Sequence, residues 1–264
     1  HCFADFSSSA GAILDVAEMA FCRREGELLR VGPGLCGGQL APALAHAGLA
    51  VTTGGCPWVA VGGVNLGRGF GFPRRTAEGD VLTCDTTTEP DLFWALRGAG
   101  GGGFGIVTAL LLEPVAFPDF RICFGAWPPE EAAAFLRVWR DHFANPADWR
   151  INLEAGLMGP DDPDDPCHVK LYGILVGPER ETAELVAGVR RTLGPLAANL
   201  QDWVPAPPQA AGYLCGLVDH QGEKAWQPSR PYAQSAYHFT RSQFFEDELS
   251  DAAIEACVRH FHEN

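Results

Sequence analysis

The chain of 264 residues lacks the features of several large protein classes. No apolar run reaches the roughly 18 residues that a membrane-spanning helix needs, so we expect no membrane partner. Basic residues are few, with 19 Lys and Arg against 33 Asp and Glu. The net charge of −14 argues against a nucleic-acid partner, because phosphate binding needs a basic surface.

Cysteine spacing excludes two further classes. The nine cysteines include no C-x-x-C pair, which argues against a zinc knuckle, and they are too sparse for a disulfide scaffold. Most of them are therefore predicted to be small buried apolar residues. The absence of paired cysteines favours a reducing compartment and predicts a cytoplasmic location, with secretion as the alternative. Because the sequence opens on His1 rather than Met, it gives no information about a leader peptide.

Glycine is abundant, and it gathers in two clusters, at 54–71 and 98–105. Neither cluster has the G-K-[ST] ending of a P-loop or the strand–helix context of a dinucleotide-binding G-x-G-x-x-G. From the residues alone, two interpretations stay open: backbone N–H groups that line a diphosphate or flavin, or tight turns between strands. The acidic run "PDDPDDP" lacks the spaced Glu of an EF-hand, so we predict a solvated loop and no metal.

The order of the predicted elements indicates an α+β fold. In the first half, short strands at 12–16 and 27–31 precede a helical stripe at 40–47, and a second helix is expected at 89–97. The second half has strong amphipathic helices at 128–144, 179–194 and 249–264. Its strands are expected at 150–159, 168–177 and 235–245. A boundary near 113–120 predicts two domains, 1–115 and 116–264.

Three blocks of sequence resemble one known family. "HCFADFSSSAGAILDVAEM", "ALAHAGLAVTTGGCPWVAVGGVNLGRGFGF" and "EPDLFWALRGAGGGGFGIVT" occur in the order and spacing of the FAD-linked oxidases of the berberine bridge enzyme type. The resemblance covers nearly all of the chain. It implies a PCMH-type FAD-binding domain, of the kind shared with vanillyl-alcohol oxidase, followed by a substrate domain with an antiparallel sheet flanked by helices.

The resemblance also implies how the cofactor, FAD, is held. In the family, one histidine bonds the flavin 8α-methyl carbon and the cysteine of a C-P-x-V-x-x-G-G block bonds C6 of the ring. These positions fall on His1 and Cys56. Such double attachment anchors the ring and raises its potential. The other implied cofactor-binding residues are Gly55, Pro57, Val61, Gly62, Gly63, Gly67, Gly69, Gly100, Gly101, Gly102, Gly105 and Val107.

The activity implied is oxidation of an alcohol, a sugar or an alkaloid-like secondary metabolite, by hydride transfer to covalent flavin that O₂ reoxidises. Tyr172, Tyr237 and His238 are the candidates to take the substrate proton. Glu154, on the strand predicted at 150–159, and Arg241, on the strand predicted at 235–245, are also expected to face the pocket. These side chains also fit an ordinary amphipathic strand. The sequence specifies neither the substrate nor the oligomeric state.

The sequence departs from the family pattern at both ends. The segment of the FAD domain that precedes His1 in relatives is absent, and so is the C-terminal segment that returns to that domain. We expect the 264 residues to be parts of a longer protein. The alternative is a flavin-free, redox-silent or cyclase-type remnant on the same fold.

Overall fold

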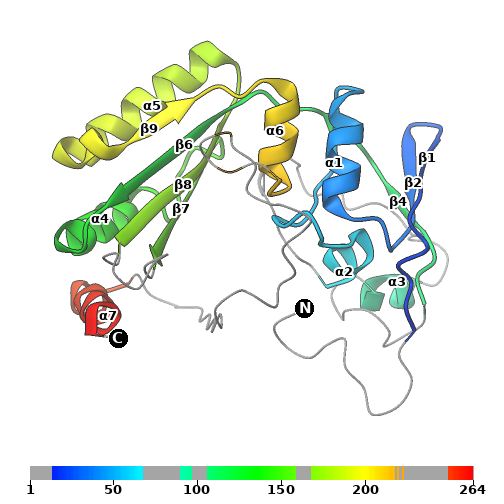
Figure 1. Ribbon diagram of the computed structural model, residues 1–264, viewed down its shortest axis with the longest axis horizontal. Coiled ribbons are helices and arrows are strands. Elements are labelled where there is room, and N and C mark those ends of the chain that lie inside the picture. The colour runs from blue at the N-terminus through cyan, green and yellow to red at the C-terminus, as the bar shows by residue number, and fades with distance from the viewer. Residues whose placement is uncertain are drawn as a thin grey trace. The chain divides into compact units, whose positions relative to one another are not determined.

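The computed structural model describes residues 14–67, 90–96, 106–158, 168–217, 219, 222 and 249–263 (Figure 1). The chain forms two compact units: His1–Pro118 with Ala206–Gly222, called here the first unit, and Asp119–Pro205 with Glu223–Asn264, the second. Helices and antiparallel sheets occur in both, which confirms the predicted α+β class. Among the described residues, no helix has both the length and the apolar character needed to span a bilayer.

The first unit is built on two small antiparallel sheets. One has the order β1-β2-β4 and the other pairs β3 with β5. The bounds of these strands are Cys22–Glu25 (β1), Leu28–Val31 (β2), Leu49–Ala50 (β3), Leu110–Leu112 (β4) and Val115–Ala116 (β5). The prediction at 27–31 corresponds to β2. β1 was missed because all its residues are exposed and carry no apolar pattern. The strand expected at 12–16 is wrong for residues 14–16, where Leu14 is 63% exposed.

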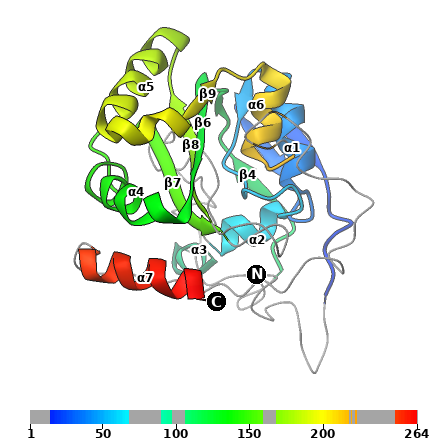
Figure 2. The same ribbon diagram turned by 60° about the vertical axis from the view of Figure 1, so that its left-hand side comes forward.

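Four helices accompany these strands: α1 (Gly37–Ala45), α2 (Val61–Leu66), α3 (Pro90–Leu96) and α6 (Pro207–Leu214). The stripe predicted at 40–47 corresponds to α1, whose Leu40 and Leu44 pack with Leu29 and Val31 of β2 in one core. α2 lies inside the segment predicted as a glycine loop. α6 lies beside α1 in both views, although more than 150 residues separate them in sequence (Figures 1 and 2).

The described residues of the second unit form a four-stranded antiparallel sheet with helices on one face. Its order is β7-β8-β6-β9, and its strands are β6 (Phe120–Trp127), β7 (Ile151–Met158), β8 (His168–Val176) and β9 (Gln201–Trp203). The helices are α4 (Pro129–His142), α5 (Glu179–Leu193), the 3-10 turn η1 (Gly194–Asn199) and α7 (Asp251–Glu263). α4 and α5 lie along one face of the sheet (Figures 1 and 2). The core between these helices and the sheet includes Trp127 and Phe135, whose rings are stacked with their centroids 4.2 Å apart.

Arginines fasten the ends of these elements. Arg140 donates to the carbonyl oxygen of Leu249 and to Asp251, both at 2.7 Å, and so holds the start of α7 against α4. The Ser250 hydroxyl accepts the Ala253 N–H at 3.2 Å and so caps the N-terminus of α7. At the edge of the sheet formed by β9, the Asp202 carboxylate accepts hydrogen bonds from Arg121 and Arg190, at 2.7 and 2.6 Å.

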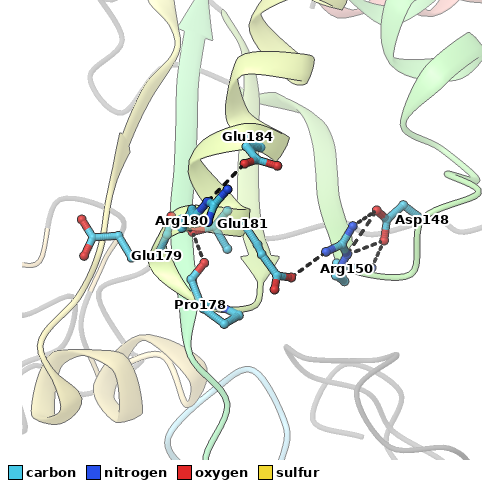
Figure 3. A network of polar contacts seen from close by, with 8 residues as sticks. Asp148, Arg150, Pro178, Glu179, Arg180, Glu181 and Glu184 are labelled. Atoms are coloured by element: carbon cyan, nitrogen blue, oxygen red, sulfur yellow. Dashed lines mark hydrogen bonds and ion pairs between the residues drawn. The ribbon is translucent and has the colours of Figure 1, made fainter.

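Arg150, at the start of β7, ties that strand to the first turn of α5 (Figure 3). Its guanidinium donates to Asp148 at 2.7 and 3.0 Å and to Glu181 at 2.9 Å. Hydrogen bonds from Arg150 hold the pKa of the Asp148 carboxyl below its ordinary value. Since folding lowers this pKa, the pair stabilises the fold above the ordinary carboxyl pKa. That contribution is lost as the pH falls through the lowered pKa.

Asp148→Asn is therefore expected to lower the urea midpoint of the second unit at neutral pH, with the difference from wild type shrinking on acidification. Denaturant midpoints measured along a pH series test this. Glu184→Gln is the matched control, because Glu184 faces Arg180 at 3.7 Å on an exposed surface where such pairs contribute little. If the urea midpoint of Asp148→Asn lies below that of wild type by the same amount at every pH, this linkage is contradicted.

Candidate flavin-binding loop and sheet face

The loop that carries Cys56 is fixed by backbone hydrogen bonds to the start of α1. We call residues 53–60 the Cys56 loop. The carbonyl oxygens of Pro57 and Val59 accept the N–H groups of Gly38 and Gly37, at 2.8 and 3.0 Å. The first-turn N–H groups of a helix have no partner within the helix, so the loop supplies one. The Val59 N–H also bonds the Cys56 carbonyl oxygen at 3.1 Å and closes a turn around Pro57.

The segment after α6 supports the same loop from the other side. Ala211 and Cys215 are fully buried, and the Leu217 N–H donates to the Gly212 carbonyl oxygen at 2.8 Å. This tight exit places Gly216, at φ 73°, against the loop: a Cβ there would lie 2.5 Å from the Gly55 carbonyl oxygen. The loop is thus fixed by α1 and by a segment from far along the sequence, and sequence reasoning missed the latter.

Cys56 is more exposed to solvent than Cys36, Cys123 and Cys215. Burial raises the pKa of the Cys123 thiol to about 12, and it also raises the pKa of the Cys22, Cys36 and Cys215 thiols. A thiol reacts as its thiolate, so these four are poorer nucleophiles. Cys56 is exposed, as are Cys22 and Cys257, but it alone of these lies on a loop held from two sides.

The Cys56 loop exposes backbone at Gly55, next to this thiol in sequence, and α2 exposes backbone at Gly63. A Cβ added at Gly55 or at Gly63 would meet no atom of the described residues within 4 Å. A planar ring needs such close access to backbone, so these residues fit a bound flavin. Pro57, Val61 and Gly62 are buried instead, and the Gly62 N–H donates to the Pro33 carbonyl oxygen at 2.9 Å. Their positions make them supports of the surface.

The remaining predicted cofactor residues divide into two sets. Gly67 is exposed at the end of α2, and Val107 is half-buried ahead of β4. The second set lies outside the described residues and comprises His1, Gly69, Gly100, Gly101, Gly102 and Gly105. The substrate-domain candidates Tyr237, His238 and Arg241 also lie outside the described residues.

Tyr172 lies on the face of the second unit's sheet that α4 and α5 do not cover. It pairs across the sheet with Glu154 of β7 and Phe124 of β6. Leu171, one residue before it in β8, and Val169, three residues before it, are fully buried on the helix-covered face. Alternation along the strand therefore places Tyr172 and Glu154 together on the opposite face.

Comparisons with known proteins identify the fold. No family profile matches the chain. In an alignment of 286 positions that covers the whole chain, it is 26% identical to the "Uncharacterized FAD-linked oxidoreductase YgaK" of Bacillus subtilis. It spans 59% of that protein, and about half the length of the first curated relatives it matches.

Two solved structures are similar as well. Glucooligosaccharide oxidase from Acremonium strictum, with 6-S-cysteinyl, 8α-N1-histidyl FAD, superposes with a TM-score of 0.67 at 21% identity, over 96% of this chain and 54% of that one. A variant of berberine bridge enzyme, described as a reticuline dehydrogenase, superposes with a TM-score of 0.69 at 19% identity, over 97% and 54%. The chain therefore has the fold of the FAD-linked oxidases of the berberine bridge enzyme type, and the resemblance drawn from its sequence is confirmed.

Proposed function

We propose that the protein is an FAD-dependent oxidoreductase that oxidises an alcohol, a sugar or an alkaloid-like secondary metabolite and holds its flavin on His1 and Cys56. One observation carries the proposal: Cys56 is an exposed thiol on a loop fixed from two sides. It supports a covalent bond because a fixed loop limits where the sulfur can lie relative to a bound ring. The similar glucooligosaccharide oxidase has a flavin bonded to cysteine and histidine.

When bound, FAD supplies the hydride acceptor, and O₂ returns it to the oxidised state with release of hydrogen peroxide. The substrate CH–OH group loses a hydride and its hydroxyl proton and becomes a carbonyl. Among the described residues, Tyr172 is the candidate to accept that proton, and Glu154, paired with it across the strands, is a candidate to orient it. Tyr237 and His238 remain candidates on the segment outside the described residues.

Cysteine mapping of the purified holoprotein tests the proposal. We expect the flavin to stay with the acid-precipitated polypeptide. After unfolding, iodoacetamide is expected to label Cys22 and Cys257 fully while the Cys56 peptide carries flavin mass. Cys22 and Cys257 are internal controls, since both are exposed thiols. Cys56→Ala should keep its flavin through His1 alone and be a weaker oxidant, because one electron-withdrawing bond is lost.

The other outcomes separate the alternatives. Complete labelling of Cys56 together with flavin released into the acid supernatant would sink the covalent proposal. A colourless protein that is folded would favour the flavin-free alternative. Reduction of the flavin by substrate without peroxide release would identify a dehydrogenase in place of an oxidase.

A further inference from the structure

Lysine is rare in this chain, and one of its two lysines lies on the face that carries Tyr172. The sequence has 19 basic residues, of which only Lys170 and Lys224 are lysine. Lys170 stands in β8 between Val169 and Leu171, which are fully buried toward α4 and α5. Alternation therefore places Lys170 on the opposite face, together with Tyr172 two residues further along.

Lys170 as a whole residue is half-buried, and no hydrogen bond or ion pair found among the described residues involves it. The arginines of the same unit behave differently. Six of them form ion pairs with carboxylates: Arg121, Arg137, Arg140, Arg150, Arg180 and Arg190. Because no carboxylate among the described residues pairs with the Lys170 ammonium, it is available to form a charge-assisted hydrogen bond with an anionic ligand.

The neighbours of Lys170 leave space around it. Its cross-strand partners are Gly156 on β7 and Ala126 on β6, the two smallest residue types, so no large side chain flanks it within its row. A Cβ added at Gly156 would lie 3.8 Å from the Tyr172 ring and 3.5 Å from the Met158 sulfur. The Tyr172 ring thus borders the space beside Gly156. Lys170 lies next to that space in the same row.

We propose that Lys170 binds the carboxylate of the substrate, so that the protein acts on a hydroxyl compound that carries a carboxylate on another part of the molecule. This inference rests on the proposed function, because Tyr172 is the candidate proton acceptor on the same face. Lys170 and Tyr172 are two residues apart on one strand, so their α-carbons are separated by about 7 Å. A uronic-acid sugar fits this pattern. A neutral sugar leaves the ammonium without a partner.

The matched ligands benzoate and benzamide test the proposal by calorimetric titration of the purified holoprotein. The two share a ring and a shape, but only benzoate is charged. We expect wild type to bind benzoate about tenfold more tightly than benzamide, and added salt to reduce that preference. Lys170→Met keeps the length of the stem and is expected to bind the two ligands equally. Lys170→Arg is expected to keep the preference for benzoate.

Arg180→Met is the control, because Arg180 is 91% exposed on α5, away from this face, and should keep the wild-type preference. Equal binding of the two ligands by wild type, no measurable binding of either, or a preference that survives Lys170→Met would each overturn the proposal. Flavin content is measured on the same samples. A sample without flavin that still shows the Lys170-dependent preference would contradict the proposed function and leave the carboxylate site standing.

Discussion

Replacement of Gly173 by alanine is expected to destabilise the second unit by about 3 kcal/mol or more, the largest stability effect we predict for a single methyl group. Gly173 lies in the central part of β8, paired with Leu153 and Cys123. Its φ is 153°, and a Cβ there would overlap the Asn152 carbonyl oxygen and lie 3.0 Å from the Leu153 Cα. Because both obstructing atoms are backbone, relief requires the paired strands to move apart.

Gly188→Ala in α5 is the matched control with the opposite sign. A Cβ at Gly188 would meet only the end of the Arg191 side chain, at 3.7 Å. Alanine inside a helix should therefore stabilise the unit by up to about 1 kcal/mol. Urea unfolding followed by tryptophan fluorescence, to which the buried Trp127 of this unit contributes, measures both variants. A Gly173→Ala midpoint within error of wild type would show that the strands yield easily and would refute the expectation.

The helices of the second unit were predictable because their apolar residues recur at the helical period. The sequence prediction at 128–144 corresponds to α4, the prediction at 179–194 to α5 and that at 249–264 to α7. Pro129 lies in the first turn of α4, where the ring costs nothing because that N–H has no helical partner. β7 and β8 were found through their apolar patterns. β6 was missed although it is the strand between β8 and β9.

α6 shows why pattern alone fails elsewhere. "VPAPPQA" is rich in proline and predicts a loop, yet α6 begins at Pro207. Proline at the start of a helix is compatible with the fold, and the burial of Ala211 and Leu214 stabilises the rest. Short helices of this length are marginal without such packing, and the partner, α1, is far away in sequence. Only the tertiary structure contains that information.

The candidate site divides in the same way. Cys56 was found from sequence because its C-P-x-V-x-x-G-G block is a local motif. The support given by Gly216 was not found, because a lone glycine near a helix end is typical of any chain turn. Lys170 was not singled out either, since a lysine in "HVKLYGILVG" fits the polar side of a strand. Its significance depends on which face the helices cover and on the lack of a carboxylate partner among the described residues.

Gly216→Ala is expected to destabilise the first unit by about 3 kcal/mol and to reduce the fraction of protein whose flavin is bonded to Cys56. Alanine at φ 73° costs about 1 to 2 kcal/mol by itself. The contact of its Cβ with the Gly55 carbonyl oxygen adds to this and displaces the residue next to Cys56. Peptide mapping of the acid-precipitated variant measures the Cys56-linked fraction, and urea unfolding measures the stability.

Gly48→Ala separates the cost of alanine at a positive φ from the effect of the contact with Gly55. Gly48 has nearly the same φ, 68°, but a Cβ there would meet nothing within 4 Å. We therefore expect Gly48→Ala to lose only the backbone contribution of about 1 to 2 kcal/mol and to keep full flavin linkage at Cys56. If both variants lose stability equally and both keep the linkage, the segment after α6 does not position the Cys56 loop. If Gly216→Ala alone loses the linkage, a glycine 160 residues away from Cys56 helps to place its sulfur.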